Sequence, residues 1–285
     1  MTSPATGLDL VASWPVAHAA VGWRHRDGRV ASVGDGGRRF ALASVTKLLT
    51  ASAVLMAVEE EIVVLDEAAG PPGATVRLLL AHASGLPFEG REPIAPPGER
   101  RAYGNAAYEV LAELVAERAQ MPFADYLHEA VLVPLAMTAT TLDGSPGAGA
   151  TSTLDDILRF AQELLAPGRV LAPETLAEAT TAQVPDLDGV LPGYGRQAPN
   201  PWGLGFEIRG TKTPHWTPPA ASPETFGHFG QAGCFLWVDP RAGVALVALT
   251  DEAFGDWALE RWPALGAEVL EAAGAGGSHG PGPDR

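Results

Sequence analysis

The strand-like segments of this chain lie near its two ends, and a long segment with helical patterning separates them. Residues 19–33 are typical of a hairpin, because the turn residues 26–29 (Arg-Asp-Gly-Arg) join two apolar runs. Two further apolar runs, 234–238 and 244–250, flank a second turn. Since strands must share a sheet to bury their apolar faces, this order predicts one sheet built from both ends of the chain, with a helical insertion between them.

We therefore predict an α/β (α+β) fold: a mixed, mainly antiparallel sheet flanked by helices, with a largely helical inserted subdomain. A length of 285 residues fits a single large domain better than two full ones. We place this domain at 1–273, with its sheet part at about 15–65 and 200–273 and its helical part at about 66–199. Residues 274–285 are mostly glycine and proline with little apolar content, which predicts a disordered tail.

Local patterns predict where the main helices lie. Residues 45–61 contain neither glycine nor proline, and their apolar residues suit a long helix that is buried on most sides. Ser44 is expected in the first turn of this helix. A second helix is predicted over 106–119 and a closing helix over 257–273, while 204–208 alternates like a strand.

Ser44 and Lys47 form a Ser-x-x-Lys pattern at the start of the long helix. A serine becomes a good nucleophile only when a base removes its proton, and a lysine three residues later lies on the same helix face. Burial can lower the pKa of a lysine enough to make it such a base, whereas arginine keeps its proton. The chain has only two lysines, Lys47 and Lys212, and one of them lies beside this serine. The pattern therefore predicts a nucleophile and its base.

Composition and missing motifs exclude several other functions. The 19 basic and 34 acidic residues give a net charge of −15, which opposes binding to nucleic acid or an anionic membrane. The sequence contains no Gly-x-Ser-x-Gly elbow, phosphate-binding loop or His-Glu-x-x-His zinc pair, so we expect neither a metal nor a cofactor. The single cysteine, Cys234, allows no internal disulfide. The N-terminus lacks the features of a secretory signal and no window suits a membrane span, so a cytoplasmic protein is expected.

Three motifs in order give the chain a family resemblance: Ser44-Val45-Thr46-Lys47, Tyr103-Gly104-Asn105 and His228-Phe229-Gly230. This set resembles the class C β-lactamase family of penicillin-binding-protein-like serine hydrolases, which includes family VIII esterases and D-aminopeptidases. Surrounding segments extend the resemblance over about residues 17–270. It implies a β-lactamase/transpeptidase-like fold.

The resemblance also implies a role for each motif residue. Ser44 would be the acylated nucleophile, and Lys47 and the phenol of Tyr103 would share the proton transfers; which of the two is the base in acylation stays open. The backbone N–H groups of Ser44 and Gln231 would form the oxyanion hole. The predicted substrate-binding residues are Asn105, which would also bind Lys47, His228, which stands where many relatives have lysine, Gly230 and Gln231.

Ordinary structural roles are the alternatives for these residues. Tyr103 would then cap a loop, Asn105 would cap the helix that follows, and His228 would be a turn residue. His82 is interpreted as structural, fixing the turn at Ser84-Gly85. The segment Lys212-Thr213-Pro214 also resembles the third motif, but we reject it because proline replaces the glycine and removes a strand N–H.

The substrate is expected to be a small ester or amide. A histidine at position 228 is only partly charged near neutral pH and would hold a substrate carboxylate less firmly than lysine does. Together with the absence of an export signal, this favours an esterase on small carboxylic esters. The alternatives are a D-amino-acid peptidase or amidase, a weak β-lactamase, and an inactive relative that binds a ligand or partner. The oligomeric state stays open.

Overall fold

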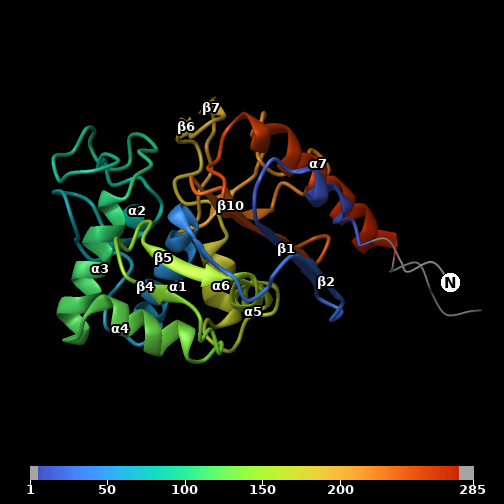
Figure 1. Cartoon of the computed structure of the whole chain (residues 1–285). Coiled ribbons are helices and arrows are strands. Elements are labelled where there is room, and N and C mark those ends of the chain that lie inside the picture. Colours follow the sequence, from blue (N-terminus) through green and yellow to red (C-terminus); the bar gives the residue numbers. More distant parts are fainter. Residues whose placement is uncertain (1–5, 276–285) are drawn as a thin grey trace, which may run out of the picture.

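The computed structural model describes residues 6–275, which are built around one large sheet (Figure 1). Its strand order is β2-β1-β11-β10-β9-β8, and each pair of neighbours is antiparallel. The N-terminal hairpin joins the C-terminal strands through the pairing of β1 with β11, which confirms the predicted fold class. The strands are β1 Ala19–His25, β2 Val30–Val33, β8 Glu207–Ile208, β9 Phe226–Gly230, β10 Cys234–Asp239 and β11 Val244–Thr250.

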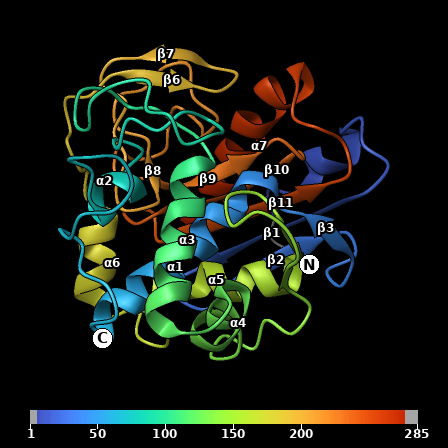
Figure 2. The ribbon, with the colours of Figure 1, turned by 90° about the vertical axis from the view of Figure 1, so that its left-hand side faces the viewer.

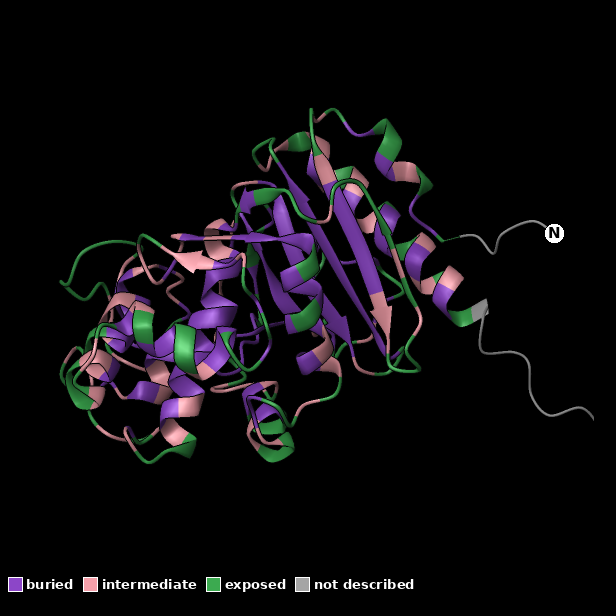
Figure 3. Cartoon of the chain, turned by 60° about the horizontal axis from the view of Figure 1, so that its bottom comes forward, coloured by how far each residue is buried: buried purple, intermediate pink, exposed green. Residues whose placement is uncertain are grey.

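The two central strands, β10 and β11, are buried along their whole length because helices cover both faces of the sheet (Figure 3). Helix α5 (Leu154–Leu165) packs on one face, and α7 (Asp256–Ala275) with the short helix η1 (Asp9–Ser13) packs on the other. Successive side chains of a strand point to opposite faces of the sheet and therefore pack in two separate cores. Leu236 packs in one of these cores and Trp237 in the other. Helix α5 packs on the sheet although it falls within the range predicted for the helical part.

The helical part gathers around α1 (Thr46–Glu59), which contacts α3 (Ala106–Ala119) (Figure 2). The predicted helix over 106–119 is thereby confirmed as α3. The remaining helices of this part are α2 Val76–Leu80, α4 Phe123–Leu127, η3 His128–Leu132 and α6 Pro173–Ala179. Short strands also occur here: β3 Arg39–Ala41, β4 Thr141–Leu142 and β5 Ala150–Thr153 form a small sheet, and β6 Gly189–Leu191 and β7 Gly195–Gln197 form a hairpin.

Three local predictions are corrected by the structure. Ser44 lies in a separate 3-10 turn, η2 (Ala43–Val45), and α1 begins only at Thr46. The strand expected over 204–208 is confined to β8, because Gly205 adopts a φ of 93° and turns the chain. Helix α7 includes Gly274 and Ala275, which were predicted to belong to the tail, and the rest of the predicted tail, 276–285, lies outside the described residues.

Candidate active site

Ser44 lies at the point where the 3-10 turn η2 runs into helix α1. The preceding residue, Ala43, has a φ of 41°, a left-handed conformation that is unfavourable for a residue with a Cβ. Ser44 is partly exposed, whereas Lys47 in the first turn of α1 is fully buried. The Nζ atom of Lys47 lies 3.3 Å from the Oγ atom of Ser44. The structure thus brings the predicted pair together, with the hydroxyl accessible and the amine shielded from water.

Oxygen atoms, but no carboxylate, surround the amine of Lys47. Besides Ser44 Oγ, they are Asn105 Oδ1 at 2.6 Å and the carbonyl oxygen of Gly147 at 2.8 Å. None of the ion pairs among residues 6–275 involves Lys47. Burial lowers the pKa of Lys47 to about 7, because the ammonium loses its hydration without gaining an opposite charge. The amine can therefore exchange a proton near neutral pH.

Asn105 comes directly before helix α3, in the N-cap position. Its side chain makes no capping hydrogen bond and is directed to Lys47 instead. A Cβ atom at Gly147 would come within 2.8 Å of Asn105 Oδ1, so glycine at this position allows the loop to approach the amide. The contact expected between Asn105 and Lys47 is present. The side chain of Asn105 does not cap the helix.

Tyr103 lies on the other side of Ser44 and is partly exposed. Its hydroxyl lies 2.8 Å from Nε2 of His228, and its phenol is near enough to Ser44 for the serine to affect its pKa. The centroid of its ring lies 4.9 Å from Nζ of Lys47. Burial raises the pKa of Tyr103 above its usual value near 10, and Ser44 opposes this shift only in part. The resting residue is therefore a neutral phenol.

His82 packs against the inner side of Tyr103. The two ring centroids lie 4.7 Å apart, and the ring of Trp202 lies 4.6 Å from His82 on another side. Neither ring nitrogen of His82 has a hydrogen-bond partner among the described residues, so the side chain does not fix the turn at Ser84-Gly85 as predicted. Its carbonyl oxygen instead accepts a hydrogen bond from the N–H of Ala102 at 2.8 Å. His82 therefore supports the segment that carries Tyr103.

Arg101 fixes the same segment by a buried network that the sequence analysis did not predict. Its guanidinium donates only to backbone carbonyl oxygens, which come from three separate stretches of chain. Because Arg101 is two residues before Tyr103, these bonds tie the tyrosine segment to the loops around it. The acceptors are Ala81, Gln183, Val184 and Asn200, at 2.6 to 3.1 Å.

His228 is placed behind Tyr103 on strand β9, and its side chain is only 1% exposed. Its Nδ1 atom lies 3.4 Å from Oε2 of Glu207, a close approach without the alignment of a full hydrogen bond. Burial lowers the pKa of His228 below 6.5, although Glu207 opposes the shift. The histidine is therefore a neutral, enclosed partner of Tyr103, and not the partly charged, accessible group expected from the sequence.

Gly230 and Gln231 bring the end of β9 against the turn that carries Ser44. A Cβ atom at Gly230 would lie 2.4 Å from the carbonyl oxygen of Leu42, so only glycine permits this close approach. Gln231 is exposed. Neither its backbone N–H nor that of Ser44 donates a hydrogen bond to another residue within 6–275. The backbone N–H groups of Ser44 and Gln231 are thus both unengaged within the described residues.

Glu207 and Lys212 are the site residues that the sequence analysis missed. Glu207 was treated as part of an alternating strand, and Lys212 was rejected as a member of the third motif. The amine of Lys212 contacts Glu207, with 2.8 Å between its Nζ atom and Oε1 of the carboxylate. The other carboxylate oxygen of Glu207 lies 3.4 Å from Nδ1 of His228. One available signal was the scarcity of lysine, which had singled out Lys47 and applies equally to Lys212.

Two further properties concern the whole described chain. Over residues 6–275, no group of three or more His, Cys, Asp or Glu side chains is arranged to hold a metal ion. No helix in that range is both long and apolar enough to cross a membrane.

Comparisons with known proteins identify the family to which the chain is similar. The β-lactamase family model matches residues 9–271 of the chain. A β-lactamase from Mycobacterium bovis is 54% identical, and its structure superposes with a TM-score of 0.92 over 94% of this chain and 99% of that one. Protein Rv1367c from Mycobacterium tuberculosis is 28% identical over 80% of each chain.

More distant structures share the fold alone. EstCE1, a hydrolase with promiscuous acyltransferase activity, is 18% identical and superposes with a TM-score of 0.76 over 93% of this chain and 96% of that one. The family model covers nearly the whole length of the chain, and the similar structures cover the same length. The chain therefore belongs to the β-lactamase family, whose members are serine hydrolases with the penicillin-binding-protein fold.

Proposed function

We propose that the protein is an esterase that hydrolyses small carboxylic esters through an acyl-enzyme on Ser44. The observation that carries this proposal is the 3.3 Å contact between the hydroxyl of Ser44 and the buried amine of Lys47, whose pKa is lowered to about 7. A neutral amine in this position is a base able to activate serine. An inactive relative that only binds a ligand would have no need of an uncompensated buried lysine, which costs stability.

In acylation the neutral amine of Lys47 takes the proton of Ser44. Its two N–H bonds are directed to Asn105 Oδ1 and the Gly147 carbonyl, which leaves the nitrogen lone pair for the serine hydroxyl. The serine oxygen then attacks the carbonyl carbon of the ester. When the acyl bond to Ser44 later breaks, the Lys47 ammonium returns the proton to the serine oxygen.

The negative charge that develops on the ester oxygen needs hydrogen-bond donors. The unengaged backbone N–H groups of Ser44 and Gln231 are the donors that we assign to this oxyanion hole. Each such donor contributes about 3 kcal/mol to stabilising the transition state in serine hydrolases. The close approach of β9 to the turn, which Gly230 allows, brings the segment that carries Gln231 next to the turn that carries Ser44.

Tyr103 is the acid and base for the leaving group and the water. Tyr103 is a partly exposed residue whose side chain lies near Ser44, so its hydroxyl can give a proton to a leaving alcohol and later take one from the attacking water. Lys47 is assigned to Ser44, and Tyr103 to the groups that enter and leave. Lys47 is proposed as the base in acylation because its amine lies 3.3 Å from the serine hydroxyl and its pKa is lowered to about 7.

An uncharged ester fits the site better than a β-lactam carboxylate. His228 is 1% exposed and its Nε2 atom is engaged by Tyr103, so it offers no free positive charge to a substrate. The half-exposed ring of Phe88 lies beside Tyr103, with 6.1 Å between ring centroids, and offers an apolar surface to an acyl or alkoxy chain.

The test compares hydrolysis of short-chain p-nitrophenyl esters, penicillins and D-alanyl peptides by wild type and Ser44→Ala. We expect the esters to be the best substrates and Ser44→Ala to lower kcat/KM by about 10³-fold or more. Ser32→Ala, an exposed serine on β2, is the matched control and should equal wild type. Equal rates for Ser44→Ala would remove the proposal, and faster turnover of a penicillin or peptide would refute the assignment to esters.

A further inference from the structure

Deacylation needs a base that Tyr103 cannot provide alone. Its raised pKa keeps the phenol protonated in the acyl-enzyme. A phenol that holds its proton can accept another only if it passes its own proton on. Lys47 is not the acceptor, because it needs the proton from Ser44 to release the serine oxygen. The remaining candidate acceptor is Nε2 of His228, which lies 2.8 Å from the Tyr103 hydroxyl.

The surroundings of His228 leave Nε2 free to accept a proton. Its other ring nitrogen, Nδ1, faces Oε2 of Glu207 at 3.4 Å inside the protein. A carboxylate accepts hydrogen bonds but donates none, so a bare Nδ1 would place two lone pairs against each other. The ring proton therefore belongs on Nδ1, and the phenol of Tyr103 donates to the unprotonated Nε2 at 2.8 Å.

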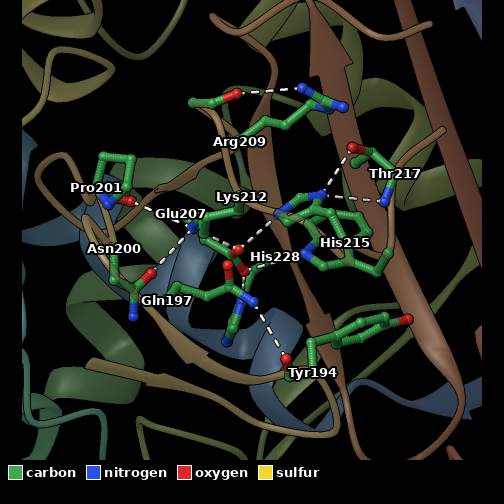
Figure 4. Close-up of polar contacts among 12 residues, drawn as sticks. Tyr194, Gln197, Asn200, Pro201, Glu207, Arg209, Lys212, His215, Thr217 and His228 are labelled. Atoms are coloured by element: carbon green, nitrogen blue, oxygen red, sulfur yellow. Dashed lines mark hydrogen bonds and ion pairs between the residues drawn. The ribbon is translucent and has the colours of Figure 1, made fainter. Parts of the chain in front are cut away.

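Glu207 is held as an anion by the residues around it (Figure 4). Its Oε1 accepts hydrogen bonds from the ammonium of Lys212 at 2.8 Å and from Nε2 of His215 at 2.9 Å, and its Oε2 accepts one from the indole N–H of Trp216 at 3.1 Å. These partners keep the pKa of Glu207 well below its usual value despite complete burial. A fixed negative charge therefore lies behind the imidazole of His228.

Other charged groups near His228 make this anion necessary. The ammonium groups of Lys47 and Lys212 both disfavour a second positive charge on the imidazole. His82 is neutral, because burial lowers its pKa far below 6.5. Glu207 is the carboxylate that faces the ring and opposes these effects. Without it, a protonated His228 would be a third buried cation in the same region.

We propose that Glu207 and His228 form a proton-accepting pair behind Tyr103, which allows the tyrosine to act as the base in deacylation. The inference rests on the acyl-enzyme of the proposed function. The water O–H bond breaks, its proton goes to the oxygen of Tyr103, and the hydroxide oxygen bonds to the acyl carbon. The phenol's own proton moves to Nε2 of His228 and forms an imidazolium beside Glu207. After Lys47 reprotonates the departing serine oxygen, His228 returns its proton through Tyr103 to solvent.

The test uses Glu207→Gln with p-nitrophenyl esters, whose leaving group departs as an anion and needs no proton from Tyr103. Glutamine keeps an amide oxygen that can face Nδ1 but gives no negative charge to stabilise the imidazolium. We expect the burst rate of acylation to stay close to wild type and deacylation to fall about 100-fold, as for loss of a general base. The acyl-enzyme should therefore accumulate, as measured by intact mass during turnover. Unchanged deacylation, or an equal fall in both steps, would overturn the inference.

Controls separate a proton-transfer role from a structural one. Glu224→Gln changes an exposed carboxylate and should match wild type in both steps. If Glu207→Gln does not fold, because it leaves Lys212 buried without a partner, the double variant Glu207→Gln/Lys212→Met removes both charges. The double variant should show the same selective loss of deacylation. If wild type forms no Ser44 adduct at all, the proposed function fails and the inference fails with it.

The position of the ring proton is a second readout that needs no turnover. NMR of protein labelled with ¹⁵N-histidine reports the tautomer of each imidazole, and a His228→Gln variant identifies the relevant signal. We expect His228 in wild type to carry its proton on Nδ1. A proton on Nε2 would refute the proton-accepting pair while leaving the proposed esterase function intact.

Discussion

Lys47, which we propose as the base, is buried without an anion. Most buried lysines are paired with a carboxylate, which keeps them charged. Here the amine contacts only neutral oxygens, those of Ser44, Asn105 and Gly147. Burial of the charged ammonium form therefore lowers the stability of the folded protein, and it gives an amine that can be neutral near pH 7.

The rate of acylation should follow the proton on Lys47. Because only the neutral amine can take the proton of Ser44, and its pKa is about 7, the burst rate should rise from pH 5.5 to 8.5 with its midpoint near 7. Stopped-flow measurement of p-nitrophenolate release over this range gives the profile. A flat profile, or a midpoint near the ordinary lysine value of 10.5, would show that Lys47 is not the base.

At the scale of elements, the site is assembled where a turn, a helix, a strand end and a loop meet. η2 and α1 supply the serine and lysine, β9 supplies His228 and Gly230, and the loop before α3 supplies Tyr103. The helix and strand are anchored by their own backbone hydrogen bonds. The tyrosine loop has no such regular support, so it depends on Arg101 and on the packing against His82.

Arg101→Lys should weaken catalysis without changing net charge. Lysine lacks the planar fork that reaches carbonyl oxygens in several directions, so the segment carrying Tyr103 should lose its fixed position. We expect kcat for ester hydrolysis to fall by about tenfold, within the cost of misplacing a catalytic group. Arg100→Lys, the exposed neighbouring arginine, is the matched control and should retain full activity. Equal activities for the two variants would contradict the role given to Arg101.

At the scale of the whole molecule, the large sheet separates two cores, and the site lies at the end of the sheet that borders the helical part. The core under α7 is rich in aromatic side chains. Trp262 is fully buried in it, with its ring centroid 5.0 Å from that of Phe235 and 5.8 Å from that of Phe229. Phe229 is next to His228 on β9, so this core also supports the site.

Trp262→Ala should destabilise the protein strongly. Removing a fully buried tryptophan side chain costs about 3–5 kcal/mol, because a large cavity replaces its contacts. The urea midpoint should fall clearly, and Trp262→Phe should lose less because it keeps an aromatic ring in the space. A midpoint that does not change in Trp262→Ala would contradict the aromatic core on this face of the sheet.

The sequence predicts the molecule well where the information is local or ordered along the chain. The strands at both ends, helix α3 and the pair Ser44 and Lys47 all follow from short patterns. The cluster behind His228 could not be predicted in the same way. Glu207 lies on a two-residue strand and Lys212 in an irregular loop, so neither has a period that reveals its burial. The contact between Glu207 and Lys212 depends on the path of the chain between the two residues.

The burial of Arg101 and the contacts of Tyr103 could not be predicted for a related reason. Their segment is rich in proline and glycine, which indicates only that it is irregular. The carbonyl oxygens that hold Arg101 come from stretches up to 99 residues away in sequence. Motif spacing identifies Tyr103 as a candidate, but its contact with His228 requires the tertiary structure.

The most direct test of the account is the site of covalent attachment during turnover. Wild type is incubated with an activated short-chain ester, quenched in acid, digested and mapped by mass spectrometry. The account predicts an acyl group on the peptide that contains Ser44, which forms rapidly and disappears as the ester is consumed. A modification on another residue, or turnover of the ester with no adduct on Ser44, would contradict it.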